Sequence, residues 1–278
     1  MKITCDLHAH THLSVCGQDC ATIARYVETA LDFGLNTVGI ADHMWDAEIP
    51  FPPEMRLSRA AGPSGEVVVE WYRKQNVEHC RRILPEIAGT DTKGIRFLFG
   101  GEVDYAPGRG AAISEREAEK LDFIIVPNSH TNHLMDKRWY ESRERHAEFM
   151  LRAAMEICTG PVRQYVTALA HPFDAVCCPY PLWEIVEKVT DAQFREVFCA
   201  AQENGIAAEI NGSCFVRMTP EEIPQSAMFR ILSAARDCGC KFTIGSDSHS
   251  GDGRKSLAAA GLAAELLGLD EGDFLRIG

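Results

Sequence analysis

The chain repeats one pattern seven times: a short apolar run typical of a β-strand precedes a longer segment with the period of a helix. The seven runs are "ITCDLHAH", "NTVGIADH", "IRFLFGGEVD", "DFIIVPNSH", "VTALAHPF", "IAAEING" and "KFTIGSDSH". Strands that alternate with helices predict a parallel sheet, and closing such a sheet leaves no strand edge exposed. We therefore expect an α/β barrel of seven parallel strands.

The segments between these runs support the same arrangement. Clear helical examples are "TIARYVETALDFG", "WYRKQNVEHCRRILPEI", "KRWYESRERHAEFMLRAAMEICTG", "DAQFREVFCAAQENG" and "MFRILSAARDCG". Four of these helices stop at a glycine, the residue that most readily closes a helix: Gly34, Gly160, Gly205 and Gly239. The prolines and glycines of residues 46–66 predict a long loop. Because periodic segments resume on both sides of it, we expect residues 1–278 to form one domain.

Charge and cysteine usage restrict the class of protein. The net charge of -12 disfavours stable nucleic-acid binding, which depends on neutralising phosphates, but a metal could still attract a small anion. The eleven cysteines are odd in number and irregularly spaced, and no basic-then-apolar leader precedes them, so we expect a cytoplasmic protein with reduced thiols. No apolar run reaches the roughly 18 residues needed to cross a membrane.

Each apolar run ends in a residue able to bind a metal. These residues are His8 and His10, His43, Glu102, His130, His171, Glu209, and Asp247 with His249. In a parallel barrel the carboxyl ends of the strands share one opening, so residues far apart in sequence converge there. In "HAH" and "DSH" the strand period of two points both members of the pair to one side. The sequence therefore predicts a metal centre at the C-terminal strand ends.

The other histidines are interpreted differently. A lone histidine at a strand end is usually a satisfied polar residue, so the repetition at seven ends carries the argument. His12 stands one step beyond the first run and His133 stands three residues beyond His130. We expect both at the rim of the site, near the substrate. His79 and His146 lie on polar faces of helical segments, where we expect them to be solvated.

The candidate ligands indicate a reaction class. Mixed imidazole and carboxylate ligands suit zinc, manganese or iron, and their number implies two to three divalent ions. Such a cluster can generate hydroxide near neutral pH and stabilise charge on a phosphate, so hydrolysis of a phosphate ester follows. The chain has no G-x-S-x-G motif and no glycine loop that ends in Lys-Ser/Thr.

At these residues the chain resembles the polymerase and histidinol phosphatase (PHP) family, and in particular its stand-alone histidinol-phosphatase-like members. The segments "DLHAHT", "GIADH", "GGEVDY", "NSH", "AHP", "EIN" and "IGSDSH" match the family motifs in order over nearly the whole chain. The resemblance implies a distorted (β/α)7 TIM-like barrel with a trinuclear centre that hydrolyses a small phosphomonoester.

The resemblance also implies how the ligands are shared. The first ion would have four ligands: His8, His10, Glu102 and Asp247. The second would share Glu102, as a bridge, and add His130 and His171. Glu102 and Asp247 would be central to catalysis, because the ions they hold activate the attacking hydroxide.

The third ion would use His43, His249 and a residue shortly after the first histidine pair. There the family usually has His or Asp, whereas this chain has Cys16. A thiolate is a good zinc ligand, so Cys16 is either a ligand or an inert buried thiol. Asp19 is the alternative ligand.

Substrate contacts are suggested by the same resemblance. Arg217 in "SCFVRM" stands where histidinol phosphatases present an arginine to phosphate, although a solvated loop arginine is the alternative. The family's basic residue after the fifth-strand histidine is missing from "HPFDAVCCPYPLW", which puts histidinol phosphate in doubt as the substrate. Arg254 and Lys255 could replace its charge. His12 and His133 are candidates for protonating the leaving alcohol.

Acidic neighbours of the ligands receive supporting roles. The resemblance implies that Glu209 shapes the surroundings of the metals without binding them. Asp6 and Asp42 point to the opposite strand face, where we expect them to orient backbone groups.

Three alternatives remain beside the phosphomonoesterase. Nucleotides or short oligonucleotides could be the substrates, since fold does not fix the leaving group. A non-catalytic, metal-stabilised binding domain is the second. Amidohydrolase-type C–N cleavage is the third, but it typically uses a lysine at the end of strand four, and "DFIIVPNSH" has none.

Overall fold

A computed structural model of the chain describes residues 2–50, 71, 74–130, 136–175, 178 and 180–277. Of the predicted long loop, residues 46–50 are described and form turns and irregular structure, whereas residues 51–66 lie outside the described part. His133 also lies outside it. Within the described ranges, no helix is long and apolar enough to cross a membrane.

All seven predicted runs contain β-structure, and every pair of neighbouring strands is parallel. The strands are β1 (Cys5–Ala9), β2 (Thr37–Ile40), β3 (His43–Met44), β4 (Arg96–Phe99), β5 (Gly101–Val103), β6 (Ile124–Pro127), β7 (Ala168–Ala170), β8 (Ala207–Asn211) and β9 (Phe242–Gly245). Two runs are interrupted, so that the second gives β2 and β3 and the third gives β4 and β5. At the second break, a Cβ on Gly100 would lie 2.3 Å from the Phe123 ring, so the bare backbone leaves room for that side chain.

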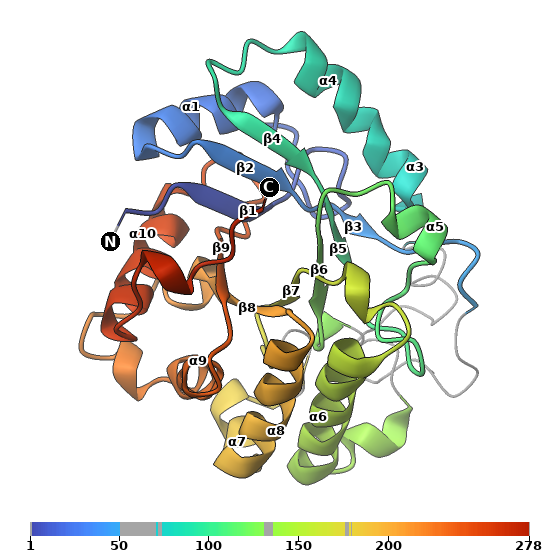
Figure 1. The fold of residues 1–278 in the computed structure, drawn as a ribbon, viewed down its shortest axis with the longest axis vertical. Coiled ribbons are helices and arrows are strands. Elements are labelled where there is room, and N and C mark those ends of the chain that lie inside the picture. Colours follow the sequence, from blue (N-terminus) through green and yellow to red (C-terminus); the bar gives the residue numbers. More distant parts are fainter. Residues whose placement is uncertain are drawn as a thin grey trace.

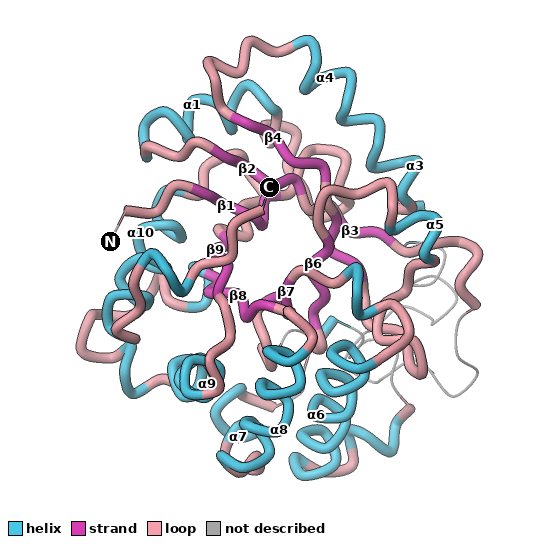
Figure 2. Tube along the Cα trace, in the orientation of Figure 1, coloured by secondary structure: helices cyan, strands magenta, loops and turns pink. Residues whose placement is uncertain are grey.

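The strands form a ring surrounded by helices (Figures 1 and 2). One ladder has the order β1-β2-β4 and the other β3-β5-β6-β7-β8-β9, and the interrupted runs connect the two ladders. The ring closes between β9 and β1. There the Asp247 backbone N–H donates to the His8 carbonyl at 2.8 Å, and the His10 N–H donates to the Ser248 carbonyl at 2.9 Å. This arrangement confirms the predicted distorted barrel.

The helices occupy the connections between strands. They are α1 (Ile23–Phe33), α3 (Val77–Cys80), α4 (Leu84–Gly89), α5 (Glu115–Ala118), α6 (Arg143–Thr159), α7 (Leu182–Val186), α8 (Asp191–Glu203), α9 (Ala227–Asp237) and α10 (Arg254–Leu266). Hydroxyl side chains begin many of them; for example, Thr190 starts α8 with a capping box. The helix predicted from residue 137 begins later, because Ser142 caps α6 there.

The core lies between the strand ring and the helices, and it contains one histidine that the sequence misplaces. His146 on α6 is 0% exposed, and its ring centroid lies 5.3 Å from that of Tyr140. His79 is half-buried, with its Nε2 3.0 Å from the Leu13 carbonyl oxygen. The expectation of a solvated side chain is therefore wrong for His146, because residues from other segments cover a helix face that looks polar in sequence, whereas His79 keeps part of its surface exposed.

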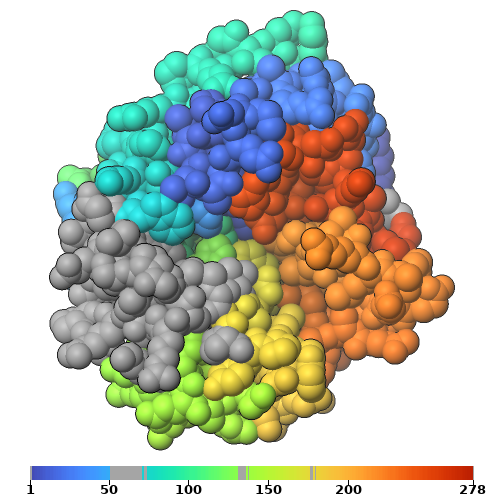
Figure 3. Space-filling view, turned by 180° about the vertical axis from the view of Figure 1, so that it is seen from behind, coloured from blue at the N-terminus to red at the C-terminus, as the bar shows by residue number. Residues whose placement is uncertain are grey.

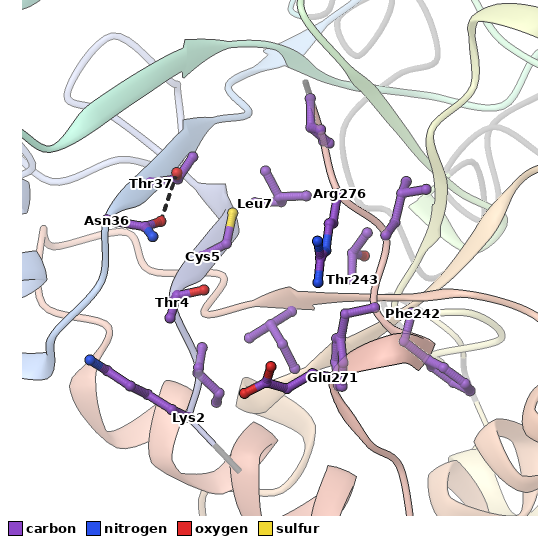
Figure 4. A pocket seen from close by; sticks show the side chains of 15 residues that line it. Lys2, Thr4, Cys5, Leu7, Asn36, Thr37, Phe242, Thr243, Glu271 and Arg276 are labelled. Atoms are coloured by element: carbon purple, nitrogen blue, oxygen red, sulfur yellow. Dashed lines mark hydrogen bonds between the residues drawn. The ribbon is translucent and has the colours of Figure 1, made fainter.

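The amino-terminal end of the barrel is covered by the C-terminal segment. Phe274 forms a bridge with Phe242 at the start of β9, and the Leu275 N–H donates to the Phe242 carbonyl at 2.9 Å. Beneath this segment lies a cavity of about 290 Å³, lined by Cys5, Thr37 and Thr243 among others (Figure 4). None of the predicted metal ligands lines it, so it is separate from the candidate site.

Candidate metal centre

The predicted ligands meet at the carboxyl ends of the strands. In each of four groups the possible donor atoms lie within 4.8 Å of one another. The groups are His10, Cys16, His43 and His249; His8, Glu102 and His171; His8, His10 and Asp247; and His43, Glu102 and His130. Blue and red segments from the two ends of the chain adjoin in the view from behind (Figure 3). All nine residues thus belong to one connected cluster, while their role as ligands stays a prediction.

The Glu102 carboxylate is the centre of this cluster. It lies on β5, is 1% exposed, and its two oxygens face five imidazoles. Oε2 lies 3.4 Å from His8 Nε2, 3.4 Å from His10 Nε2 and 3.0 Å from His43 Nδ1, and Oε1 lies 3.0 Å from His171 Nε2 and 3.5 Å from His130 Nδ1. A carboxylate with different imidazoles at each oxygen has the geometry of a bridging ligand.

Asp247 supplies the second central carboxylate. Its Oδ1 lies 3.3 Å from His10 Nε2 and 3.6 Å from His8 Nε2. The backbone of Asp247 has φ +54°, and that of His171 has φ +23°, a region that non-glycine residues seldom occupy. Such strained conformations are retained where the surrounding structure fixes a functional side chain.

Cys16 belongs to the third group of donor atoms. It lies in the loop after β1 with its Sγ 3.2 Å from Ser14 Oγ. The His249 and His10 rings of the same group stack with centroids 4.5 Å apart. Burial raises the pKa of the Cys16 thiol to about 12, so without a cation it is protonated at neutral pH. Asp19 is exposed and belongs to none of the four groups.

Glu209 holds two of the candidate ligands from outside the cluster. Its Oε1 lies 2.7 Å from His8 Nδ1, and its Oε2 accepts the His171 backbone N–H at 2.6 Å. Pairing Nδ1 with a carboxylate leaves Nε2 of His8 free to bind a metal. Gly245 makes this approach possible, because a Cβ there would lie 2.0 Å from Glu209 Oε1.

Two further aspartates orient the backbone beside the ligands, as the sequence predicts. Asp42 accepts the Thr11 backbone N–H and the Thr11 hydroxyl, both at 2.6 Å. Asp6 accepts the backbone N–H groups of His8 at 3.1 Å and Ser246 at 2.9 Å. These bonds fix the strand ends from which the candidate ligands project.

Charge in the cluster is strongly coupled. Burial alone would raise the carboxylate pKa values, but nearby imidazoles hold the pKa of Glu102 and of Asp247 well below their usual range. Burial alone would lower the pKa values of His8 and His171. The nearby carboxylates have the larger effect, so the pKa of His8 is raised and that of His171 is raised to about 9. The two carboxylates are therefore ionised at neutral pH.

Burial keeps three other imidazoles of the cluster neutral. Burial lowers the pKa of His10 and of His130, and it lowers the pKa of His43 to about 4. Neutral imidazole is the form that binds metals, so these side chains need not release a proton first.

The donor set fits divalent cations. Glu102 Oε2 is buried and has no hydrogen-bond partner among the described residues, although three imidazoles surround it. Nε2 of His8 and Nε2 of His10 face each other at 3.1 Å. Two imidazole nitrogens beside a carboxylate oxygen without a hydrogen-bond partner are a donor set that suits a divalent ion.

The residues expected to contact substrate are less closely assembled. Arg217 is exposed in the segment after β8 and makes no ion pair with another described residue. His12 lies outside the four groups, with its Nε2 3.6 Å from Glu86 Oε2. Arg254 is bound to Asp252 through Nε at 2.8 Å, and to Asp32. The idea that Arg254 supplies free positive charge at the site is therefore wrong.

The sequence interpretation missed two polar neighbours of the cluster. Asp104 Oδ1 lies 3.6 Å from His130 Nδ1, and the Asn211 side-chain amide donates to Asp247 Oδ2 at 3.3 Å. Each stands two residues after a carboxylate already identified, Glu102 or Glu209. The strand period of two would have placed them on the same face.

Comparison with known proteins gives two curated relatives and several solved structures of similar fold. No family model matches the chain. Two relatives, each named a probable phosphatase, come from Thermoanaerobacter sp. (strain X514) and Thermoanaerobacter pseudethanolicus. Each is 26% identical over 250 residues, which cover 90% of this chain and 80% of the relative.

Solved structures share the fold. The histidinol phosphate phosphatase of Lactococcus lactis, complexed with zinc, L-histidinol and phosphate, aligns with a TM-score of 0.60 at 16% identity, over 96% of this chain and 94% of that one. A structure from Listeria monocytogenes aligns with a TM-score of 0.58 at 14% identity, over 90% of this chain and 97% of that one. The chain therefore shares its barrel fold with these two proteins.

Proposed function

We propose that this protein is a metal-dependent phosphomonoesterase of the PHP type, similar in its chemistry to histidinol phosphatases. The observation that carries the proposal is the buried Glu102 carboxylate, which faces five imidazoles across its two oxygens. The relatives named as phosphatases and the fold shared with a zinc-bound histidinol phosphate phosphatase support it.

The donor groups correspond to two or three ions. His8, His10 and Asp247 would hold one ion with Glu102, and His130 and His171 would hold a second that Glu102 bridges. Cys16, His43 and His249 would hold a third. Zinc, manganese and iron all suit this mixture of ligands.

The chain's own residues would prepare the site for hydrolysis. Divalent ions bound here would lower the pKa of water and offset the negative charge of a phosphate. Glu209 orients His8, and the Asn211 amide orients Asp247, so both side chains are fixed before substrate arrives. Arg217 would contact the phosphate from the rim, and His12 or His133 would donate a proton to the leaving alcohol.

The substrate is proposed to be a small phosphorylated molecule. The protein carries a net charge of -12, so attraction of a phosphate depends on the metal cluster and a few cations such as Arg217. Arg254 is occupied by Asp252 and Asp32, so among the described residues beside the cluster it adds little free positive charge. This favours an ester whose leaving alcohol is neutral or positively charged over a long polyanion.

A substrate panel tests the proposal. Purified protein reconstituted with zinc, manganese or iron is assayed for phosphate release from histidinol phosphate, sugar phosphates, nucleoside monophosphates and an aryl phosphate, with metal content determined in parallel. We expect the metal-loaded protein to release phosphate from at least one monoester and the metal-free protein to release none. Stoichiometric metal binding without turnover of any ester would refute the catalytic function.

A variant pair isolates the role of Glu102. Glu102→Gln should lower both metal content and turnover, the latter at least about 100-fold, because it removes the charge shared by the imidazoles. Glu196→Gln, on the exposed side of α8, is the matched control and should change neither. Full metal content and activity in Glu102→Gln would show that Glu102 is not a ligand.

A further inference from the structure

Two cysteines face each other on the outside of the barrel, away from the metal centre. Cys199 lies on α8 and Cys238 lies directly after α9, two helices that flank the ring (Figure 1). Their Sγ atoms are 3.1 Å apart, and both residues are free and partly exposed. A disulfide has an S–S distance of about 2.05 Å, so an approach of about 1 Å would join them.

We propose that Cys199 and Cys238 form a modification site, where a low-molecular-weight disulfide oxidises the two thiols to a disulfide that links α8 to α9. Both thiols can be reached by a small oxidant because neither residue is buried. A metal site is the competing interpretation of paired cysteines. Among the residues that the structure describes, however, no third metal-binding side chain joins this pair.

The positions of the neighbouring thiols indicate that the oxidant should join Cys199 to Cys238 and not to another cysteine. Cys240 is buried, and its Sγ lies 3.1 Å from the Phe198 carbonyl oxygen. Cys158 is buried on α6. Within the described part of the chain, the one close contact between two cysteine sulfurs is that of Cys199 with Cys238. Oxidation should therefore join these two and leave Cys158 and Cys240 as thiols.

The reaction balances as two exchange steps. The thiolate of one cysteine attacks the oxidant R–S–S–R, forms a mixed disulfide and releases one R–S⁻, which takes up the proton. The second cysteine, as thiolate, then attacks the protein sulfur of the mixed disulfide and releases the second R–S⁻. Two protein thiols thereby lose two electrons and two protons, and the oxidant becomes two thiols. Burial and the neighbouring thiol raise the pKa of Cys238 to about 11, so the reaction should accelerate as pH rises.

The cross-link would have a structural effect. It would close a chain segment that contains β8, α9 and the exposed loop with Arg217. A closed loop reduces the freedom of the unfolded chain, so oxidation should raise the unfolding midpoint temperature by about 5 °C.

Mass spectrometry on the full-length protein tests the proposal. The protein is incubated with oxidised glutathione at pH 8, blocked with iodoacetamide and digested with trypsin without reduction. A cross-link is expected between the peptides 196–217 and 237–241, and dithiothreitol should remove it. Fragmentation must assign it to Cys199 and Cys238, because Cys214 and Cys240 lie in the same peptides.

Single substitutions supply the controls. Cys199→Ser and Cys238→Ser should each abolish the cross-link, whereas Cys240→Ser and Cys214→Ser should retain it together with the rise in unfolding temperature. A cross-link that survives in Cys199→Ser, or glutathione adducts on Cys199 or Cys238 that never resolve, would overturn the proposal. Because this test does not measure turnover, its result is independent of the proposed phosphatase activity.

Discussion

The buried histidine of α6 predicts how the stability of the protein depends on pH. Burial lowers the pKa of His146 from 6.5 to about 4, against a smaller opposing contribution from the Trp139 backbone. Between these values the unfolded chain binds a proton on this residue and the folded chain does not. The free energy of unfolding therefore falls as pH decreases from about 6.5 to 4. At 1.36 kcal/mol per pH unit, this interval amounts to about 3 kcal/mol, of which about 2 kcal/mol is lost between pH 7 and pH 5.

His146→Phe should remove this dependence while retaining an aromatic ring beside Tyr140. Urea unfolding of both proteins, freed of metal with a chelator, gives the free energy of unfolding at pH 7, 6 and 5. As pH falls from 7 to 5, the free energy of unfolding of the wild type should decrease by about 2 kcal/mol more than that of the variant. Groups common to both proteins cancel in the comparison. A difference that stays constant with pH would refute the assignment of a buried, neutral His146.

Three further predictions concern the candidate metal centre. Glu209→Gln should weaken metal binding about 10- to 100-fold because His8 loses its orienting carboxylate, and a metal titration followed by calorimetry would measure this; unchanged affinity would contradict the orienting role. Gly245→Ala should lower the unfolding temperature and the metal content together, since its Cβ would lie 2.0 Å from Glu209 Oε1; a wild-type melting curve would show that the strand adjusts freely. Cys16→Ser should reduce bound metal by one ion per chain in elemental analysis if Cys16 is a ligand, whereas full occupancy would identify it as an inert thiol.

The sequence predicts the barrel well because its signals are local. Each strand is marked by an apolar run, and each run ends in a side chain that must lie at the common opening of a parallel barrel. Glu102 and Asp247 are found in this way, since their position relative to the strand end is enough to place them near each other. The break at Gly100 cannot be predicted from its own run, because it depends on the ring of Phe123, which directly precedes β6.

Features that depend on tertiary partners could not be predicted. The sequence neighbours of His146 are charged, yet aromatic residues that include Tyr140 and Tyr180 surround its ring in the fold. Arg254 looks free beside the candidate ligands, but Asp32, from the end of α1, reaches it. Tyr180 and Asp32 come from segments that are distant in sequence and that the fold brings beside His146 and Arg254.

The closure of the ring between β1 and β9 has a consequence for biosynthesis. The cluster takes His8 and His10 from the first strand and Asp247 and His249 from just after the last one. A nascent chain emerging from the ribosome cannot assemble the full set of donors until the final strand has been made. Binding of the proposed metals by the full set of donors would therefore wait until residues 247–249 have been made and β9 has closed the ring against β1.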